Sequence, residues 1–296
     1  VALRRRRAHG KPSGPVPLAP QVAPVDAGEI AVTWYGHASA LVEIDGRRIL
    51  TDPVWSRRVS PTQRIGPARL HPTPVPLEEL PAVDAIVISH DHYDHLDKST
   101  IQRLAGLQDA PFVVPIGIGA HLRQWKIPED RIVELDWDEQ REIAGITITC
   151  TEARHFSGRG LRRDLTQWAS WAFAGPDHRV FFGGDTGYTV KFAEIGAKYG
   201  PFDLTLLPVG AYDPRWADIH MNPEEAVRAH GDLGGKVLVP VHWATFNLAF
   251  HPWVEPIVRL KAAAEQVGAA TAVPMPGQRL DVSRGVGDDR WWARLG

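Results

Sequence analysis

Cysteine is almost absent from this sequence, because Cys150 is the single cysteine among 296 residues. One cysteine cannot form an intrachain disulfide, and it cannot supply the several thiolates of a zinc–thiolate cluster. Any metal site in the chain must therefore rely on histidine and carboxylate ligands. The rarity of cysteine also favours a reducing compartment, so we expect a cytoplasmic location.

Long apolar runs are missing as well. No stretch approaches the about 18 consecutive apolar residues that a membrane-spanning helix needs. Residues 1–27 are basic and rich in proline, and they lack the apolar core of a signal peptide. We interpret them as a solvated N-terminal arm, although a basic arm also suits peripheral contact with the anionic lipids of a membrane.

The sequence has no excess of one charge. It holds 33 basic and 35 acidic side chains, for a formal net charge of -2. Nucleic-acid-binding domains are usually clearly basic, so we expect no nucleic-acid partner. The composition is typical of a globular protein. It does not change abruptly after Gly28, so we expect one domain over residues 28–296, and association into a homo-oligomer stays open.

Short β-rich runs alternate with helical patterns along this domain. We expect strands at residues 30–35, 40–44, 47–51, 83–89, 112–115, 131–135, 143–149, 170–174, 180–183, 204–208 and 236–241, and helices at 97–107, 119–125, 189–199, 222–230 and 253–267. Asp45-Gly46 predicts a hairpin, and Asn222-Pro223 followed by Glu225 predicts a capping box. The alternation favours an α/β domain with a core of two sheets.

A cluster of metal-ligating residue types follows the expected strand at 83–89. It reads His90-Asp91-His92-Tyr93-Asp94-His95. In an extended loop alternate side chains project to the same side, so His90, His92 and Asp94 can face one centre. The neighbouring His95 can turn toward a second centre. The alternative interpretation is a loop of histidines that bond only to polar neighbours.

Three further candidates, His155, Asp185 and His242, each follow directly on a β-rich run, as His90 does. Residues at strand ends of layered α/β folds point into a shared crevice, so these distant segments can build one site. Imidazole and carboxylate donors without thiolates suit zinc first, and also manganese or iron. The sequence therefore predicts a site for divalent metal ions.

The order of these residues resembles the five-motif signature of the metallo-β-lactamase fold superfamily over about residues 30–275. The motifs are Thr51-Asp52-Pro53, His90-x-His92-x-Asp94-His95, His155, Asp185 and His242. The short motifs that surround these residues resemble the branch of phospholipases D that hydrolyse N-acylphosphatidylethanolamine. They are Trp34-Tyr35-Gly36-His37-Ala38, His155-Phe156-Ser157-Gly158-Arg159, His220-Met221-Asn222-Pro223-Glu224-Glu225-Ala226 and His242-Trp243-Ala244-Thr245-Phe246.

The resemblance implies a four-layer αββα sandwich that holds two divalent metal ions. One ion would be held by His90, His92 and His155, and the other by Asp94, His95 and His242, with Asp185 bridging both. It also implies a catalytic part for Asp185, for Asp52 as a residue that orients a ligand, and for His220 near the substrate. Asp52 as a plain turn residue and His220 as a helix-entry residue are the alternatives. His37 and His230 we interpret as structural.

The resemblance and the predicted ligands together favour a metal-dependent hydrolase. Two cations that share a water lower its pKa, so a metal-bridging hydroxide would be the nucleophile. We expect a phosphodiesterase of phospholipase D type that acts on a small-molecule or lipid phosphodiester. The rival activity is hydrolysis of a lactone, an amide or a β-lactam on the same metal ions. A non-catalytic metal or ligand sensor is the alternative of another class, and bound iron would open redox chemistry.

Two segments rich in arginine support a phosphodiester substrate. Residues 54–77 and 154–164 hold eight arginines against one aspartate, at positions 57, 58, 64, 69, 154, 159, 162 and 163. Arginine binds phosphate through paired hydrogen bonds, although solvated loop arginines are equally expected. Tryptophans at positions 55, 168, 171 and 216 are candidates for an apolar groove, and core packing is their alternative.

Overall fold

The computed structural model describes residues 10–20, 26–160, 162–285, 287 and 290–296. Its strands form two mixed sheets of seven strands each. The first sheet runs in the order β14 (Arg279–Asp281), β1 (Ile30–Gly36), β2 (Ser39–Ile44), β3 (Arg47–Thr51), β4 (Ala85–Val87), β5 (Phe112–Pro115) and β6 (Ile132–Leu135). The second runs in the order β13 (Ala270–Thr271), β12 (Val237–Val241), β11 (Leu204–Pro208), β10 (Arg179–Phe182), β9 (Ser170–Ala174), β8 (Ile146–Thr151) and β7 (Gln140–Ile143).

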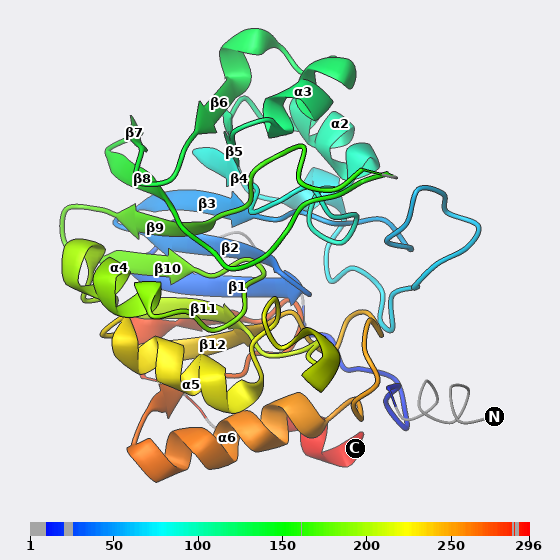
Figure 1. Cartoon of the computed structure of the whole chain (residues 1–296), viewed down its shortest axis with the longest axis vertical. Helices are drawn as coiled ribbons and strands as arrows, with labels where there is room; N and C mark the ends of the chain where they lie inside the picture. Colours follow the sequence, from blue (N-terminus) through cyan, green and yellow to red (C-terminus); the bar gives the residue numbers. More distant parts are fainter. Residues whose placement is uncertain (1–9, 21–25, 161, 286, 288–289) are drawn as a thin grey trace.

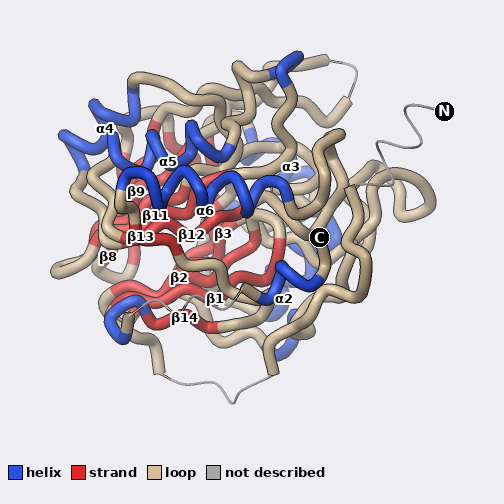
Figure 2. The backbone as a smooth tube through the Cα atoms, turned by 90° about the horizontal axis from the view of Figure 1, so that it is seen from below, coloured by secondary structure: helices blue, strands red, loops and turns tan. Residues whose placement is uncertain are grey.

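Helices cover the outer faces of the two sheets (Figures 1 and 2). The first sheet is covered by α2 (Lys98–Leu107) and α3 (Ile118–Gln124), and the second by α4 (Lys191–Tyr199), α5 (Pro223–Asp232) and α6 (Glu255–Val267). Short 3-10 helices lie at Leu77–Glu79, Glu129–Arg131, Pro214–Trp216, Val282–Arg284 and Trp291–Arg294. The order helix, sheet, sheet, helix confirms the expected αββα sandwich.

The period-two pattern of the strands divides the core into layers. In β4, Ala85 and Val87 join the large cluster that fills the space between the sheets, whereas Ile86 joins a second cluster with Ile101 and Leu104 of α2. Successive side chains of a strand point to opposite faces, so a continuous apolar run suits a strand that is buried on both sides. This explains why the first sheet can carry helices outside and a second sheet inside.

Local signals in the sequence form the expected turns and caps. Asp45 and Gly46 have φ angles of 47° and 75°, the left-handed conformation that a tight hairpin such as β2–β3 requires. The Asn222 side chain accepts a hydrogen bond from the Glu225 amide, and the Glu225 carboxylate accepts one from the Asn222 amide, both at 2.9 Å. The predicted hairpin and capping box are both confirmed.

Other parts of the chain depart from the expectations. Strands β7, β13 and β14 are short, and the sequence analysis did not predict them. Residues 1–9 and 21–25 of the expected arm lie outside the described residues. In its described part, Val16 is 6% exposed and belongs to the large core cluster, and the Ser13 amide donates to the Leu295 carbonyl. This part therefore packs on the domain, which corrects the expectation that it is solvated.

The ends of the strands determine where polar residues gather. Asp52 follows β3, and the segment beginning at His90 follows β4 in the first sheet. His155, Asp185 and His242 follow β8, β10 and β12 in the second sheet. Among the described residues, no helix combines the length and the apolar character that crossing a bilayer requires.

Candidate metal centre

The Asp185 carboxylate lies at the centre of the gathered side chains. Its Oδ2 atom lies 3.1 Å from His242 Nε2 and 3.2 Å from His95 Nε2. The same oxygen lies 3.9 Å from both His90 Nε2 and His155 Nε2. An oxygen surrounded by imidazole nitrogens from both sheets has the geometry that a bridging ligand requires.

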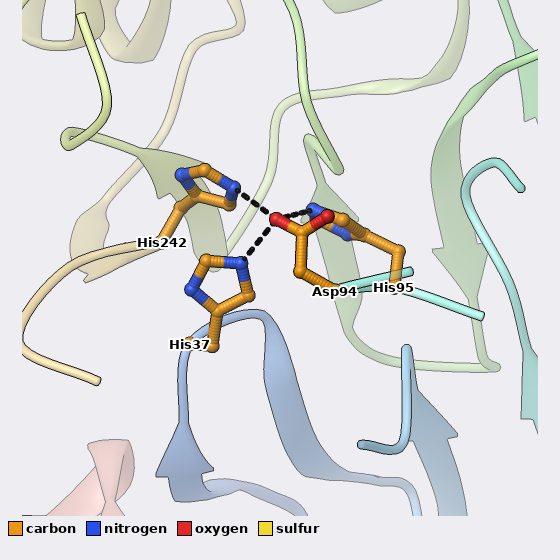
Figure 3. Close-up of side chains that lie close together, drawn as sticks. All are labelled: His37, Asp94, His95 and His242. Carbon is orange, nitrogen blue, oxygen red and sulfur yellow. Dashed lines mark hydrogen bonds and ion pairs between the residues drawn. The ribbon is translucent and has the colours of Figure 1, made fainter. Parts of the chain in front are cut away.

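The other predicted ligands form two groups around this carboxylate. One group is His90, His92 and His155, and the other is Asp94, His95 and His242 together with His37 (Figure 3). Within each group the candidate ligand atoms lie within 4.8 Å of one another. The two groups are the sets expected from the sequence, except that the second contains one histidine more.

Buried polar atoms without hydrogen-bond partners at the centre indicate that the site suits cations. Among the described residues, His95 Nε2, His242 Nε2 and Asp185 Oδ1 are buried and have no hydrogen-bond partner. Buried polar atoms in folded proteins normally have one, so converging donors without partners are the atoms that a metal ion would engage. The mixed nitrogen and oxygen set fits zinc, manganese or iron. The residues present therefore fit a divalent metal centre.

Residues behind the centre orient two of these imidazole rings. Asp52 is fully buried, and its Oδ2 accepts a hydrogen bond from His95 Nδ1 at 2.6 Å. Ser89 holds the same carboxylate through its amide at 2.7 Å and its hydroxyl at 2.6 Å. His155 Nδ1 bonds to the Ile219 carbonyl at 2.9 Å. Such contacts fix which ring nitrogen faces the metal, so Asp52 lies where an orienting residue is expected.

Burial and carboxylate charge act in opposite directions on the histidines. Burial lowers the pKa of His155 to about 3 and that of His90 well below its ordinary value, so both rings are neutral, as ligands must be. Burial alone would also lower the pKa of His242, but Asp185 and Asp94 raise it to about 9. The negative charge that attracts a proton to His242 attracts a metal cation equally well.

A cavity of about 550 Å³ opens onto the cluster. Its lining combines four of the predicted ligands with His220, Arg163 and apolar side chains, namely His92, Asp94, Asp185, His242, His220, Arg163, Phe156, Ala211, Trp216, Ile219 and Leu248. His220 Nδ1 lies 4.0 Å from Asp185 Oδ2. The structure thus places His220 beside the ligands and at the cavity, as expected for a residue near the substrate.

Most of the arginines considered from the sequence do not face this cavity. Among its lining residues Arg163 is the one guanidinium, and it packs over the Phe156 ring at 4.8 Å. Arg154 pairs with Asp218, and Arg69 donates to the Val54 carbonyl. Of the candidate tryptophans Trp216 lines the cavity, whereas Trp171 is fully buried in the core.

Arg159 connects two ligand-bearing loops instead of facing the cavity. Its Nη1 donates to the carbonyls of Asp91, at 2.8 Å, and of Leu96, and its guanidinium lies 4.2 Å from the centre of the Tyr93 ring. The Tyr93 hydroxyl donates in turn to the Arg159 carbonyl at 2.7 Å. Gly158 also donates its amide to the Asp91 carboxylate at 2.6 Å. These bonds tie the loop of His155 to the loop that carries His90 through His95.

His37 is the site residue that sequence reasoning missed. Its ring is 1% exposed, and its Nε2 lies 2.8 Å from Asp94 Oδ2. The motif around His37 resembles the phospholipase branch, and this resemblance was the signal that could have identified the residue. The position of His37 between two expected strands favoured a structural interpretation instead. His230 does agree with that interpretation, because it is buried and bonds to the Thr205 hydroxyl at 2.8 Å.

Comparisons with known proteins agree with this geometry. A family model described as the beta-lactamase superfamily domain matches residues 47–243. An uncharacterised protein of Mycobacterium tuberculosis is 60% identical over 294 residues, which cover 98% of this chain and 79% of that protein. N-acyl-phosphatidylethanolamine-hydrolyzing phospholipase D 1 of Caenorhabditis elegans is 40% identical over 242 residues, which cover 77% of this chain and 68% of that protein.

A solved structure shows the same architecture. The metallo hydrolase Igni18 from the archaeon Ignicoccus hospitalis aligns with a TM-score of 0.63 at 25% identity, over 85% of this chain and 97% of that one. Fold, site geometry and sequence matches therefore converge. The chain belongs to the metallo-β-lactamase superfamily of metal-dependent hydrolases, and within it resembles the branch of N-acylphosphatidylethanolamine-hydrolysing phospholipases D.

Proposed function

We propose that this chain is a binuclear, zinc-dependent phosphodiesterase that cleaves a small-molecule or lipid phosphodiester in a reaction of the phospholipase D type. The first ion would be held by His90, His92 and His155, the second by Asp94, His95 and His242, and Asp185 would bridge them. The observation that carries the proposal is the position of Arg163, a cation at the cavity that also exposes the ligands. The 40% identity to a phospholipase D supports it.

The chain's own residues divide the work in this proposal. Bound divalent ions supply Lewis acidity and lower the pKa of water toward neutrality, which is the chemistry that hydrolysis needs. Arg163 binds a phosphate oxygen through charged hydrogen bonds. Burial lowers the pKa of His220 to about 4, so at neutral pH its uncharged ring can donate one N–H to a substrate oxygen. Asp52 keeps the His95 ring oriented through its Nδ1 atom.

The apolar side of the cavity supports a substrate that carries a hydrocarbon part. Phe156, Trp216, Ile219 and Leu248 lie on the lining together with Arg163. Two residues beyond Arg163, the side chain of Leu165 is 70% exposed. An exposed leucine beside arginines suits shallow insertion at an anionic lipid surface, so peripheral membrane contact is part of the proposal. Co-sedimentation with anionic vesicles should weaken in L165D.

The test measures phosphodiester hydrolysis with and without the positive charge of Arg163 at the cavity. We expect the metal-loaded protein to hydrolyse bis(p-nitrophenyl) phosphate, and the variant R163Q to lose about 10- to 100-fold in kcat/KM, as expected for one charged hydrogen bond. The matched control is R162Q, an exposed arginine one residue away that lines no described cavity of the site. R162Q should retain the activity.

The other outcomes distinguish the rival functions. Turnover of a neutral lactone or of nitrocefin without phosphodiester turnover would assign the site to carbon-centred hydrolysis and overturn the proposal. Metal binding without any turnover would indicate a sensor. Iron in protein purified without added metal, together with oxygen consumption, would indicate redox chemistry. Equal activity of R163Q and wild type on the diester would remove the observation on which the phosphodiester assignment rests.

A further inference from the structure

His37 contacts a predicted ligand of the second ion from a turn in the first sheet. It lies between β1 and β2, has a φ angle of 55°, and is 1% exposed. Figure 3 shows its ring facing the Asp94 carboxylate and lying beside the His242 ring, with a distance of 4.0 Å between the two ring centres, whereas the His95 ring approaches the carboxylate from the other side. A histidine at positive φ is uncommon, so the turn holds this side chain in an unusual direction.

The contact fixes how the His37 ring is protonated. An ionised carboxylate can only accept hydrogen bonds, so His37 Nε2 carries the hydrogen that bonds to Asp94 Oδ2 at 2.8 Å. His37 Nδ1 is buried and has no hydrogen-bond partner among the described residues. The ring therefore meets its polar neighbours through Nε2, which donates to Asp94. The same Oδ2 atom lies 3.4 Å from His242 Nε2 and 3.5 Å from His95 Nε2.

The backbone of His37 holds a second predicted ligand. Its carbonyl accepts a hydrogen bond from the His242 amide at 2.9 Å and another from Trp34 Nε1 at 2.8 Å. Its own amide donates to the Thr245 hydroxyl at 2.6 Å. His242 also has a positive φ angle, of 61°. His37, in a turn of the first sheet, thus holds both the side chain of Asp94 and the backbone of His242, which directly follows β12 of the second sheet.

We propose that His37 is a positioning residue for the second metal ion. Its Nε2–H turns the Asp94 carboxylate so that Oδ2 faces His95 and His242, and its carbonyl fixes the loop of His242. In this inference His37 holds Asp94 and not the ion, because its Nε2 lies 2.8 Å from Asp94 Oδ2 and its Nδ1 is on the edge of the ring that points away from the carboxylate in Figure 3. The inference rests on the binuclear part of the proposed function. Residues that orient ligands in this way typically change metal affinity 10- to 100-fold.

Two amide substitutions separate this role from a general structural one. In H37Q the side-chain amide reaches the place of Nε2 and can still donate to Asp94. In H37N the amide is too short to reach Asp94, although asparagine tolerates positive φ well and preserves the turn. The matched control is H230N, which replaces a histidine that is equally buried, at 3% exposure, and lies outside the metal groups.

The experiment titrates the metal-free proteins with Co²⁺ and records stoichiometry, affinity and the visible absorption of each bound ion. We expect wild type and H230N to bind two ions. H37N should bind the first ion as wild type does and the second about 10- to 100-fold more weakly, and H37Q should recover most of this loss. Thermal unfolding of each metal-free variant reports whether it is folded.

Three results would overturn the inference. Wild-type affinity of H37N for both ions would show that His37 positions nothing. Equal weakening in H37Q and H37N, with a changed absorption spectrum of the second ion, would make His37 a direct ligand. A single ion in wild type would refute the binuclear site, and the inference with it. Two ions in wild type without phosphodiester turnover would refute only the proposed reaction.

Discussion

Replacing Arg159 should loosen both loops that carry the predicted ligands of the first ion. The variant R159Q loses the charged hydrogen bonds to the carbonyls of Asp91 and Leu96 and the packing over Tyr93. A hydrogen bond that involves a charged group contributes about 1.5–3 kcal/mol, and a cation–π contact about 1 kcal/mol. Because glutamine retains part of this bonding, we expect a loss of about 3 kcal/mol of unfolding free energy.

Two assays measure this effect. The unfolding midpoint of R159Q should fall by roughly 6–12 °C, since 1 kcal/mol shifts a domain of this size by about 2–4 °C. Its affinity for the first ion should fall about tenfold, as for other residues that orient ligands. The control R162Q removes an exposed arginine of the same loop and should stay within about 0.5 kcal/mol of wild type. If R159Q matches R162Q in both assays, Arg159 does not hold the loops together.

Two further predictions follow from buried groups. Burial lowers the pKa of His230 and of His71 to about 4, below the about 6.5 of the unfolded chain, so the unfolded state binds more protons between these values. Acidification from pH 7 to pH 5 should therefore lower the unfolding free energy by up to about 2 kcal/mol per histidine. Urea unfolding of H230N should show a correspondingly weaker dependence on pH, and an unchanged dependence would contradict the lowered pKa of His230. A Cβ at Gly210 would lie 2.2 Å from the His242 carbonyl oxygen, so G210A should weaken metal binding, whereas G231A, with nothing within 4 Å, should not.

The layered fold could be predicted because its signals are local. The run Val83 to Ser89 is apolar except for Asp84 and Ser89, and the strand within it, β4, is buried on both faces. The hairpin at Asp45-Gly46 and the helix cap at Asn222 depend on residues a few positions apart. Strands β7 and β14 escaped prediction because they lack apolar alternation, and β14 is held by pairing with the distant β1. Their stability comes from neighbours that the local sequence does not indicate.

The candidate site could be predicted only in part for the same reason. Histidines and aspartates at strand ends are visible in the sequence, and the structure brings all seven predicted ligands together. The contact between His37 and Asp94 joins residues 57 positions apart, and it depends on a turn at positive φ. Arginine composition was a poor guide to the cavity, because a guanidinium bonds to backbone carbonyls as readily as to a substrate. Arg159 shows this, since its bonds end on Asp91 and Leu96.

The charge balance of the centre explains why its parts occur together. Asp52, Asp94 and Asp185 bring three carboxylates into a buried region, where unpaired charge is costly. Without cations, that charge is balanced by protons, which is why the carboxylates raise the pKa of His95 and of His242 above the ordinary value despite burial. Metal ligands must be unprotonated, so bound cations replace these protons. The carboxylates therefore destabilise the fold when no positive charge compensates them, and for the same reason they give the site its affinity for cations. His37 and Asp52 then fix which ligand atoms face the metal site.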